Sequence, residues 1–275
     1  ISGGPGDDDL FGGEVDDDIT GGEGSDAVHG GSGADSLSGG AGDDVLSGGE
    51  GSDSLLGDSG DDVLIGGAGD DVLAGGEGSD DLQGGDDTDQ VTQSVNADQT
   101  LTDTELTGQG PDTLSGIEGA DLTGGASANT IDASSFTLGS VTISGGAGDD
   151  TLTGGTGNDS LSGGDDADSL IGGSGDDSLT GGAGNDELAG GLGSDQVTQS
   201  VDADQVLTDT SLTGEGTDTL SSIEGADLTG GDGDNTIDAS AFTLGTVTLA
   251  GGAGDDTLAG GSSGDSLSGG TGDDV

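Results

Sequence analysis

The sequence predicts an all-β fold, a right-handed parallel β-roll or β-solenoid with two strands in each coil. Three observations lead to this prediction. The 275-residue chain repeats the nine-residue pattern Gly-Gly-x-Gly-x-Asp-x-U-x nineteen times, with Leu, Ile or Val at U in the complete copies. The sixth position is Asp in all nineteen copies. The chain has 67 Gly and 58 acidic residues but no Lys or Arg. A fixed period this short is typical of a solenoid.

Each repeat divides into a turn and a strand. The first six residues are rich in Gly and Asp and predict a tight turn, because Gly adopts backbone angles that other residues avoid. The last three residues, x-U-x, predict a very short strand whose U side chain points inward. Two repeats then form one coil, with a strand on each side and a turn at each end. The aliphatic row that includes Leu37, Leu46 and Leu55 would stack into a thin core.

The acidic turns predict bound metal. Stacked turns place columns of carboxylates side by side, and the formal charge of −58 at pH 7 opposes compaction unless cations neutralise it. Calcium suits such turns because it accepts about six to eight oxygen ligands in flexible geometry. An acidic, Gly-rich chain without a repeat would be expected to be disordered. With the repeat, we expect disorder only in the metal-free state, so that folding and metal binding are one event.

The repeats resemble those of the RTX family (repeats-in-toxin, haemolysin-type calcium-binding repeats), and Gly39–Ser47 is a copy without departures. The resemblance implies a parallel β-roll with each calcium ion between turns two repeats apart. Backbone carbonyls and the position-six Asp side chains are the implied ligands. These aspartates are Asp8, Asp17, Asp26, Asp35, Asp44, Asp53, Asp62, Asp71, Asp80, Asp89, Asp150, Asp159, Asp168, Asp177, Asp186, Asp195, Asp256, Asp265 and Asp274.

The number of calcium ions follows from the same arrangement. If each ion needs two turns, a block of n repeats holds at most n − 2 internal sites, so blocks of ten, six and three repeats predict roughly thirteen ions. The copies that begin at Gly12, Gly57, Gly84, Gly163 and Gly260 lack a consensus glycine. We expect those turns to be strained or to bind calcium less well.

The repeats fall into three blocks separated by two spacers. Residues 1–92 contain ten repeats, 145–198 contain six, and 251–275 contain a truncated third block. The spacers, 93–144 and 199–250, match each other at 39 of 52 positions, so a period of 106 residues overlies the nonapeptide.

The spacers predict metal-poor coils of the same solenoid. They are rich in Thr, Val, Ile and Leu in strand-like alternation, and Asn129 and Asn235 stand where the calcium aspartate would be. Phe136 and Phe242 would fill wider coils. The alternative is a small insertion packed on the side of the roll.

The composition argues against several functions. We expect no enzyme, because nucleophile–base pairs and phosphate clamps have almost nothing to use in a chain without Cys, Lys, Arg or Tyr. His29 is the only histidine, and its outward position favours a surface role. The acidic charge makes nucleic acid and anionic membranes poor partners, and no apolar run is long enough for membrane insertion. Ice binding would need regular rows of Thr or Asn, which the mixed third and fifth positions lack.

These observations favour an extracellular structural protein. We expect a calcium-stabilised, rod-like segment of a surface filament, surface layer or adhesin stalk, located outside the cell or at its surface. Its expected partners are calcium and copies of itself. The alternative is the secretion and folding module of a larger toxin or hydrolase. The resemblance to RTX proteins implies that either would leave the cell through a type I exporter.

Overall fold

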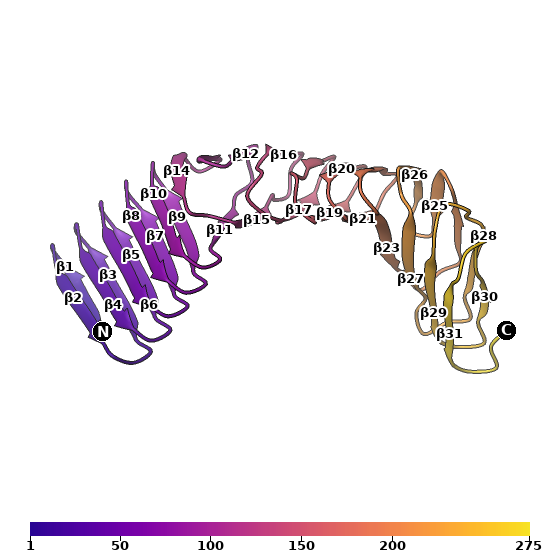
Figure 1. The fold of residues 1–275 in the computed structure, drawn as a ribbon, viewed down its shortest axis with the longest axis horizontal. Helices are drawn as coiled ribbons and strands as arrows, with labels where there is room; N and C mark the ends of the chain where they lie inside the picture. The colour runs from indigo at the N-terminus through magenta and orange to yellow at the C-terminus, as the bar shows by residue number, and fades with distance from the viewer. The chain divides into compact units, whose positions relative to one another are not determined.

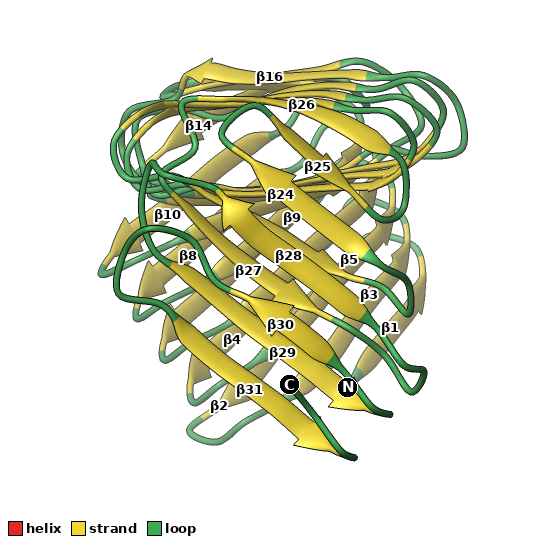
Figure 2. Ribbon diagram, turned by 90° about the vertical axis from the view of Figure 1, so that its right-hand side faces the viewer, coloured by secondary structure: helices red, strands yellow, loops and turns green.

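The computed structural model describes residues 1–275 as 31 β-strands without a helix. Figure 1 labels the strands, and Figure 2 shows that only loops and turns join them. The chain divides into two compact units. Unit 1 contains Ile1–Thr123 and Ser135–Val141, and unit 2 contains Gly124–Ser134 and Thr142–Val275. No helix that could cross a membrane is present.

Unit 1 is built from two parallel sheets whose strands alternate along the chain. The first sheet contains β1 (Ser2–Pro5), β3 (Asp18–Glu23), β5 (Ser36–Ala41), β7 (Ser54–Ser59), β9 (Val72–Glu77), β11 (Gln90–Ser94) and β15 (Gly119–Thr123). The second contains β2 (Asp9–Gly13), β4 (Ala27–Ser32), β6 (Val45–Glu50), β8 (Val63–Ala68), β10 (Asp81–Asp86) and β14 (Pro111–Ser115). Each pair of consecutive strands therefore forms one coil, which confirms the predicted β-solenoid.

The register confirms that two nonapeptides make a coil. Leu37 on β5 pairs with Leu55 on β7, and Leu46 on β6 pairs with Leu64 on β8, eighteen residues apart in both cases. The predicted three-residue strands were too short. Most strands in the blocks have six residues, because pairing continues from the x-U-x segment through the Gly-Gly-x segment of the next repeat, as in Gly22↔Gly40. Only the fourth to sixth positions form the turn.

The aliphatic position of the repeat forms the core. Leu46, Leu64, Leu73 and Leu82 are fully buried, and Leu37 is 2% exposed. Their neighbours on the same strands face outward, as the two-residue alternation of a strand requires. Burying one such side chain contributes roughly 1.5–3 kcal/mol.

The first spacer combines solenoid coils with an antiparallel excursion. β15 pairs with β11 at Gln90↔Gly119, and β14 pairs with β10 at Asp81↔Thr113, both in parallel register. Between β11 and β14, the strands β12 (Gln99–Thr102) and β13 (Glu105–Thr107) form an antiparallel pair, and β13 pairs antiparallel with β14. The coils therefore continue through the spacer, but at separations of 29 and 32 residues instead of eighteen.

Unit 2 repeats this organisation. Its first sheet contains β17 (Val141–Ala147), β19 (Ser160–Asp165), β21 (Ser178–Ala183), β23 (Gln196–Ser200), β27 (Gly225–Thr229), β29 (Val247–Ala253) and β31 (Ser266–Thr271). Its other strands are β16 (Thr130–Ser135), β18 (Thr151–Thr153), β20 (Ser169–Ser174), β22 (Glu187–Leu192), β24 (Gln205–Thr208), β25 (Ser211–Thr213), β26 (Thr217–Ser221), β28 (Thr236–Ala241) and β30 (Thr257–Ala259). β24, β25 and β26 form the antiparallel excursion of the second spacer.

The two spacer phenylalanines lie in the core. Phe136 in unit 1 and Phe242 in unit 2 are fully buried and are the largest such side chains. Phe11, in the first block, is 63% exposed and stacks on His29 with ring centroids 4.8 Å apart. The block and spacer boundaries drawn from the sequence describe its repeats and differ from the boundary between the compact units.

Candidate metal-binding turns

The position-six aspartates form a hydrogen-bonded ladder along each column of turns. Oδ1 of Asp26 accepts the backbone N–H of Asp8 at 2.8 Å, and Oδ1 of Asp44 accepts that of Asp26 at 2.7 Å. The same bond recurs through the blocks with a spacing of eighteen residues. Most of these carboxylates are almost completely buried, with Asp44, Asp62 and Asp71 each 1% exposed. One oxygen of each carboxylate is therefore satisfied by the backbone.

The second carboxylate oxygen has no hydrogen-bond partner in most turns. Such unpaired, buried Oδ2 atoms belong to Asp8, Asp17, Asp26, Asp35, Asp44, Asp53, Asp62, Asp71, Asp80, Asp89, Asp150, Asp168, Asp177, Asp186, Asp195 and Asp256. A buried, charged oxygen without a partner is costly, and proteins normally pair such groups or use them as metal ligands. The chain has no Lys or Arg that could pair with them.

Each unpaired oxygen faces a space beside the first glycine of its own repeat. A methyl group at Gly12 would lie 2.5 Å from Oδ2 of Asp17 and 2.6 Å from the carbonyl oxygen of Gly30, one coil further along. Both distances are too short for a carbon atom, so the two oxygen atoms converge beside this glycine and leave no room for a side chain. We call the space between a position-six Oδ2 and the carbonyl of the next coil a cradle.

The cradles follow the predicted count. Within the blocks, a carboxylate and a block glycine carbonyl converge beside eight first-position glycines in block one, four in block two and one in block three. Two more cradles, at Gly84 and Gly190, receive the carbonyls of Gly116 and Ser222 from the spacers. A glycine is required at each of these positions because any Cβ atom would clash with the two oxygen atoms of the cradle.

Burial disfavours the charged form of these carboxylates. It raises the pKa of Asp62, Asp71 and Asp168 to about 6, with smaller contributions from the neighbouring aspartates of the same column. The hydrogen bond that each accepts from the backbone opposes this rise. A metal-free turn therefore holds its carboxylates in an unfavourable charged state at neutral pH.

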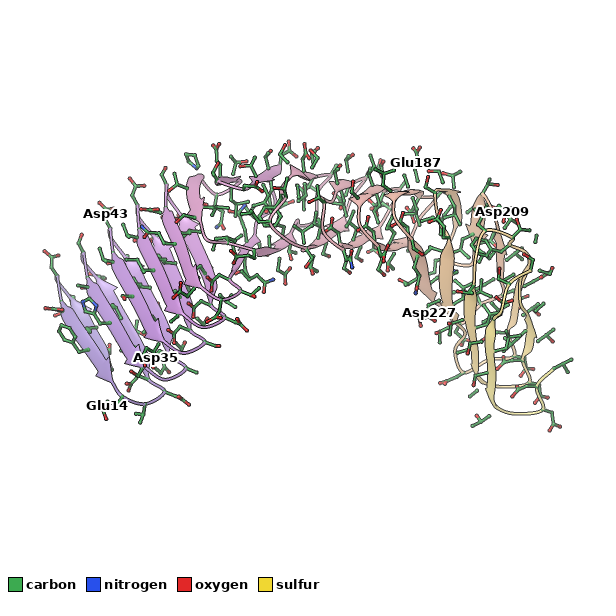
Figure 3. All side chains as sticks on the ribbon, in the orientation of Figure 1. Glu14, Asp35, Asp43, Glu187, Asp209 and Asp227 are labelled. Carbon is green, nitrogen blue, oxygen red and sulfur yellow. The ribbon has the colours of Figure 1, made fainter.

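The second acidic residue of each turn has a different role. Asp43 is exposed and accepts the backbone N–H of Asp61 at 3.1 Å, and Asn158 accepts that of Asp176 at 2.9 Å. Their bonds reach the following coil, whereas the position-six bonds reach the preceding coil. Figure 3 shows Asp43 and Asp35, which belong to successive turns, at opposite edges of the first block.

The turns that lack a consensus glycine keep the consensus backbone in three cases. Asp58, Asp87 and Asp166 replace glycines and have φ values of 75°, 81° and 78°. This left-handed region is unfavourable for most side chains but is tolerated by Asp. Asp62, Asp89 and Asp168 in the same repeats keep an unpaired Oδ2. The expectation that these turns are strained or bind calcium less well stays a prediction.

Three predicted ligands differ from the rest. Oδ2 of Asp159, in the cradle at Gly154, accepts the backbone N–H of Gly155 at 2.7 Å, so one of the thirteen block cradles has a carboxylate oxygen that is already hydrogen-bonded. Asp265 and Asp274 are more exposed, but their Oδ1 atoms keep the ladder bonds to the N–H groups of Val247 and Asp256.

The spacer asparagines resemble Asp159 in their bonding. Oδ1 of Asn129 accepts the N–H of Gly125 at 3.0 Å, and Oδ1 of Asn235 accepts that of Gly231 at 2.8 Å. Each asparagine thus satisfies its own turn with a neutral side chain, which agrees with the prediction that the spacers are metal-poor.

Four acidic residues of the ladders were missed in the sequence. Asp112 and Asp218 accept the N–H groups of Asp80 and Asp186 at 3.1 and 3.2 Å. Thr107–Ser115 and Thr213–Ser221 match the nonapeptide pattern at every position except the first glycine. A search that allowed this one departure would have found both aspartates. Glu118 and Glu224 accept the N–H groups of Asp89 and Asp195, both at 3.1 Å, and no nonapeptide marks them.

The candidate site depends on backbone atoms as much as on side chains. No three His, Cys, Asp or Glu side chains converge as a metal cluster. Each cradle instead combines a carboxylate oxygen with a backbone carbonyl. His29 lies outside the turns, and its Nε2 is 3.9 Å from Oδ1 of Asp9.

Parallel coils with buried, unpaired carboxylates at their turns define a calcium-binding β-solenoid. The family model for the RTX calcium-binding nonapeptide repeat (4 copies) matches residues 1–19, 20–55, 56–91, 137–161, 162–197 and 248–275, about two thirds of the chain. The chain therefore belongs to the RTX calcium-binding repeat family. No curated protein matches it.

Proposed function

We propose that this chain is an extracellular, calcium-stabilised structural protein, a solenoid segment of a surface filament, surface layer or adhesin stalk. The observation that supports it most directly is the set of sixteen buried Oδ2 atoms without partners in a chain that has no Lys or Arg. A fold with this many uncompensated carboxylates needs cations.

The proposed ligands are the position-six carboxylates and the carbonyls that face them. In the turn at Gly12, Asp17 and the carbonyl of Gly30 would hold the ion, and the equivalent pairs would do so in the other cradles. The thirteen cradles within the blocks support roughly thirteen ions, and the spacer carbonyls of Gly116 and Ser222 would add two. Calcium would supply the positive charge that the turns lack and would hold successive coils together.

Metal binding and folding are coupled in this proposal. Removing calcium would leave −58 formal charges with only backbone hydrogen bonds to hold the acidic turns together. Extracellular calcium-binding modules commonly have Kd values on the order of 10⁻⁴–10⁻³ M, so the chain would stay unfolded in the cytosol and fold outside. RTX repeats are typical of secreted proteins, which agrees with export through a type I system.

The coupling is tested by circular dichroism and small-angle scattering of the whole chain. We expect β-structure and a compact scattering profile in millimolar calcium, and an expanded chain in excess chelator. A chain that stays folded in chelator would contradict the proposal.

The structural role requires copies of the chain to associate, and electron microscopy tests this separately. We expect ordered fibres or sheets in native extracellular material, dissolving on chelation. Dispersed monomers that fold and unfold with calcium would instead support the second candidate, a secretion and folding module of a larger exported protein. The calcium-linked fold fits that candidate equally well, and neither role requires catalysis by this chain.

A further inference from the structure

Two glutamines occupy positions that the repeat reserves for glycine. β11 pairs with β9 in the register Gln90↔Val72, which places Gln93 one coil beyond Gly75. β23 pairs with β21 in the register Gln196↔Ser178, which places Gln199 one coil beyond Gly181. First-position residues of the repeat are glycines because a Cβ atom would clash with the oxygen atoms of the cradle. A glutamine in this register therefore puts a side chain where the oxygen atoms of a cradle would otherwise converge.

The glutamine amides bond to the groups around them. Nε2 of Gln93 donates to Oε1 of Gln99 and to the carbonyl of Thr107, both at 3.0 Å, and Nε2 of Gln99 donates to the carbonyl of Thr123 at 2.9 Å. Gln93 is 7% exposed and Gln99 is 1% exposed. Both N–H groups of the Gln93 amide thus donate hydrogen bonds, one to the buried Gln99 and one to the partly buried Thr107.

The second spacer repeats the network. Nε2 of Gln199 donates to Oε1 of Gln205 at 3.1 Å and to the carbonyl of Thr213 at 3.2 Å, and Nε2 of Gln205 donates to the carbonyl of Thr229 at 2.9 Å. Gln199 is 6% exposed and Gln205 is fully buried. The network therefore recurs at the 106-residue period of the chain.

The turns below the glutamines are altered in the same two places. In blocks one and two, every first-position glycine has both a position-six Oδ2 and a carbonyl of the next coil close to its missing Cβ, except Gly75 and Gly181. At these two glycines, the three nearest atoms all belong to Asp80 and Asp186, respectively. No carbonyl of the next coil therefore lies closer than 2.9 Å to the missing Cβ of Gly75 or closer than 3.1 Å to that of Gly181.

We propose that the Gln93 and Gln199 amides replace a calcium ion, so that the first coil of each spacer closes without metal. The proposal rests on the calcium role proposed above for the acidic turns. An amide N–H group supplies partial positive charge to carbonyl oxygens and needs no carboxylate to balance it. A neutral hydrogen-bond network between buried amides also favours a single arrangement.

The surrounding spacer has its own means of stability without metal. Leu101, Leu106, Ile117 and Leu122 are at most 1% exposed, and Phe136 is fully buried. Each spacer is therefore a metal-independent folded segment within a metal-dependent chain. Since solenoid coils form by stacking on an existing neighbour, the spacers provide the surface on which calcium-bound coils begin to stack.

Hydrogen exchange of the whole chain, in calcium and in excess chelator, tests the proposal. In chelator we expect peptides from 93–123 and 199–229 to exchange at least tenfold more slowly than peptides from 21–74 and 154–180. Protection in both regions would overturn the calcium role of the turns. Loss of protection in both would overturn the metal-independent spacer and leave the calcium role intact.

Glutamate variants test the amides themselves. Gln93→Glu with Gln199→Glu replaces N–H donors by acceptors that face Oε1 of Gln99 and Gln205 and the carbonyls of Thr107 and Thr213. We expect up to two additional calcium ions by native mass spectrometry, and spacer protection that is lost in chelator.

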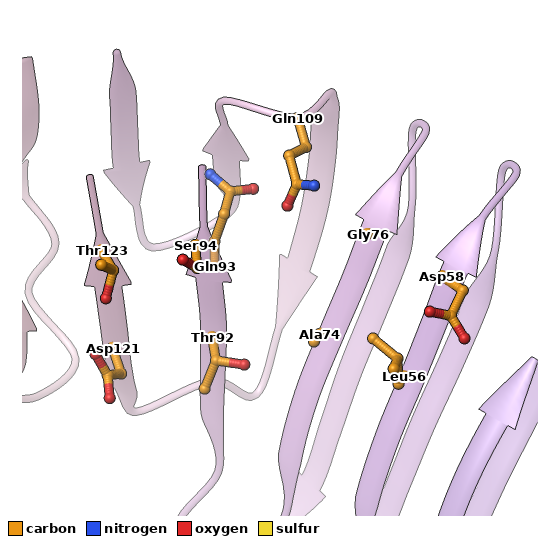
Figure 4. Close-up of a pocket in the computed structure, with 10 residues that line it drawn as sticks. All are labelled: Leu56, Asp58, Ala74, Gly76, Thr92, Gln93, Ser94, Gln109, Asp121 and Thr123. Carbon is orange, nitrogen blue, oxygen red and sulfur yellow. The ribbon is translucent and has the colours of Figure 1, made fainter. Parts of the chain in front are cut away.

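Gln109→Glu is the matched control, because the second spacer already carries Glu215 at that position. Figure 4 shows Gln109 and Gln93 on the lining of one surface groove, so the control adds the same charge nearby without touching the network. Equal calcium counts and equal spacer protection in the glutamate variants and the control would overturn the role of the amides. If the double variant does not fold in calcium, the proposal is judged by the hydrogen-exchange pattern of the unmodified chain.

Discussion

The backbone N–H of Asp44 donates a hydrogen bond of 2.7 Å to Oδ1 of Asp62, one coil further along the chain. Both residues are 1% exposed, and Oδ2 of each has no partner. The same aspartate thus joins two coils through one oxygen and offers the other to a cradle. Only a short side chain with two oxygen atoms can do both, which explains why the sixth position is Asp in every repeat.

Asp44→Asn should lower calcium binding without breaking the ladder. Asparagine keeps an Oδ1 acceptor for the N–H of Asp26 but removes the negative charge from the cradle. The number of charged ligands sets calcium affinity, so we expect binding at this turn to weaken by roughly tenfold or more. Native mass spectrometry at limiting calcium should show one ion fewer.

Asp43→Asn is the control for that variant. Its position-five side chain is exposed and bonds only to the backbone of Asp61, and asparagine makes the equivalent bond at Asn158 and Asn185. We expect an unchanged ion count. An equal loss of calcium in both variants would refute the assignment of position six as the ligand.

Gly39→Ala should block one cradle. The new Cβ atom would contact both Oδ2 of Asp44 and the carbonyl of Gly57. We expect the loss of one ion, because the methyl group would push these two oxygen atoms out of position. Gly119→Ala is the control, since its Cβ would meet its nearest neighbour at an ordinary 3.6 Å. Calorimetric titration with calcium should separate the two variants, and identical titrations would argue against the cradle.

Acid should stabilise the metal-free fold and weaken calcium binding. Burial raises the pKa of Asp62, Asp71 and Asp168 from 3.8 to about 6, so their protonated forms are favoured by folding. Their contribution to metal-free stability is fully present below about 3.8 and is lost as the pH rises through about 6.

Circular dichroism checks both consequences. In chelator, β-structure should increase as the pH falls from 7 to 4. In calcium, the midpoint of the calcium titration should rise over the same range, because protons compete for the carboxylates. A metal-free spectrum that does not change with pH would contradict the prediction.

Phe136→Ala should destabilise the first spacer. Its side chain is fully buried, and removing a buried phenylalanine typically costs about 3–5 kcal/mol. Phe11→Ala is the control, since Phe11 is 63% exposed and stacks only on His29. Thermal unfolding in saturating calcium should show a clear decrease for Phe136→Ala and a small one for Phe11→Ala. Equal decreases would contradict a core role for Phe136.

The period of the repeat predicted the coil, its core and its acidic turns. Alternation fixes the inward direction of Leu37 and Leu46, and eighteen residues bring Asp26 over Asp8, so local pattern and stacking agree. The strand length was underestimated because Gly has low strand propensity on its own. Here pairing with an identical segment of the next coil, as in Gly22↔Gly40, overrides that propensity.

The spacer contacts were harder to predict because their separations are irregular. Asp80 meets Asp112 at a distance of 32 residues, and Asp89 meets Glu118 at 29. The antiparallel pair of β12 and β13 lies between these residues and sets the two separations. The nonapeptide period does not predict either separation. The roles of Gln93 and Gln99 depend on the same geometry, so their pairing becomes visible only in the folded chain.

The unequal coil lengths also solve a problem of alignment. Within a block, a slip of one full coil would exchange leucine for leucine and aspartate for aspartate, so near-identical repeats offer many almost equivalent mispairings. The spacer pairs Asp81↔Thr113 and Gln90↔Gly119 cannot be reproduced after such a slip, because their offsets of 32 and 29 residues occur nowhere within a block. The spacers therefore fix the strand register of a sequence whose repeats alone would allow several.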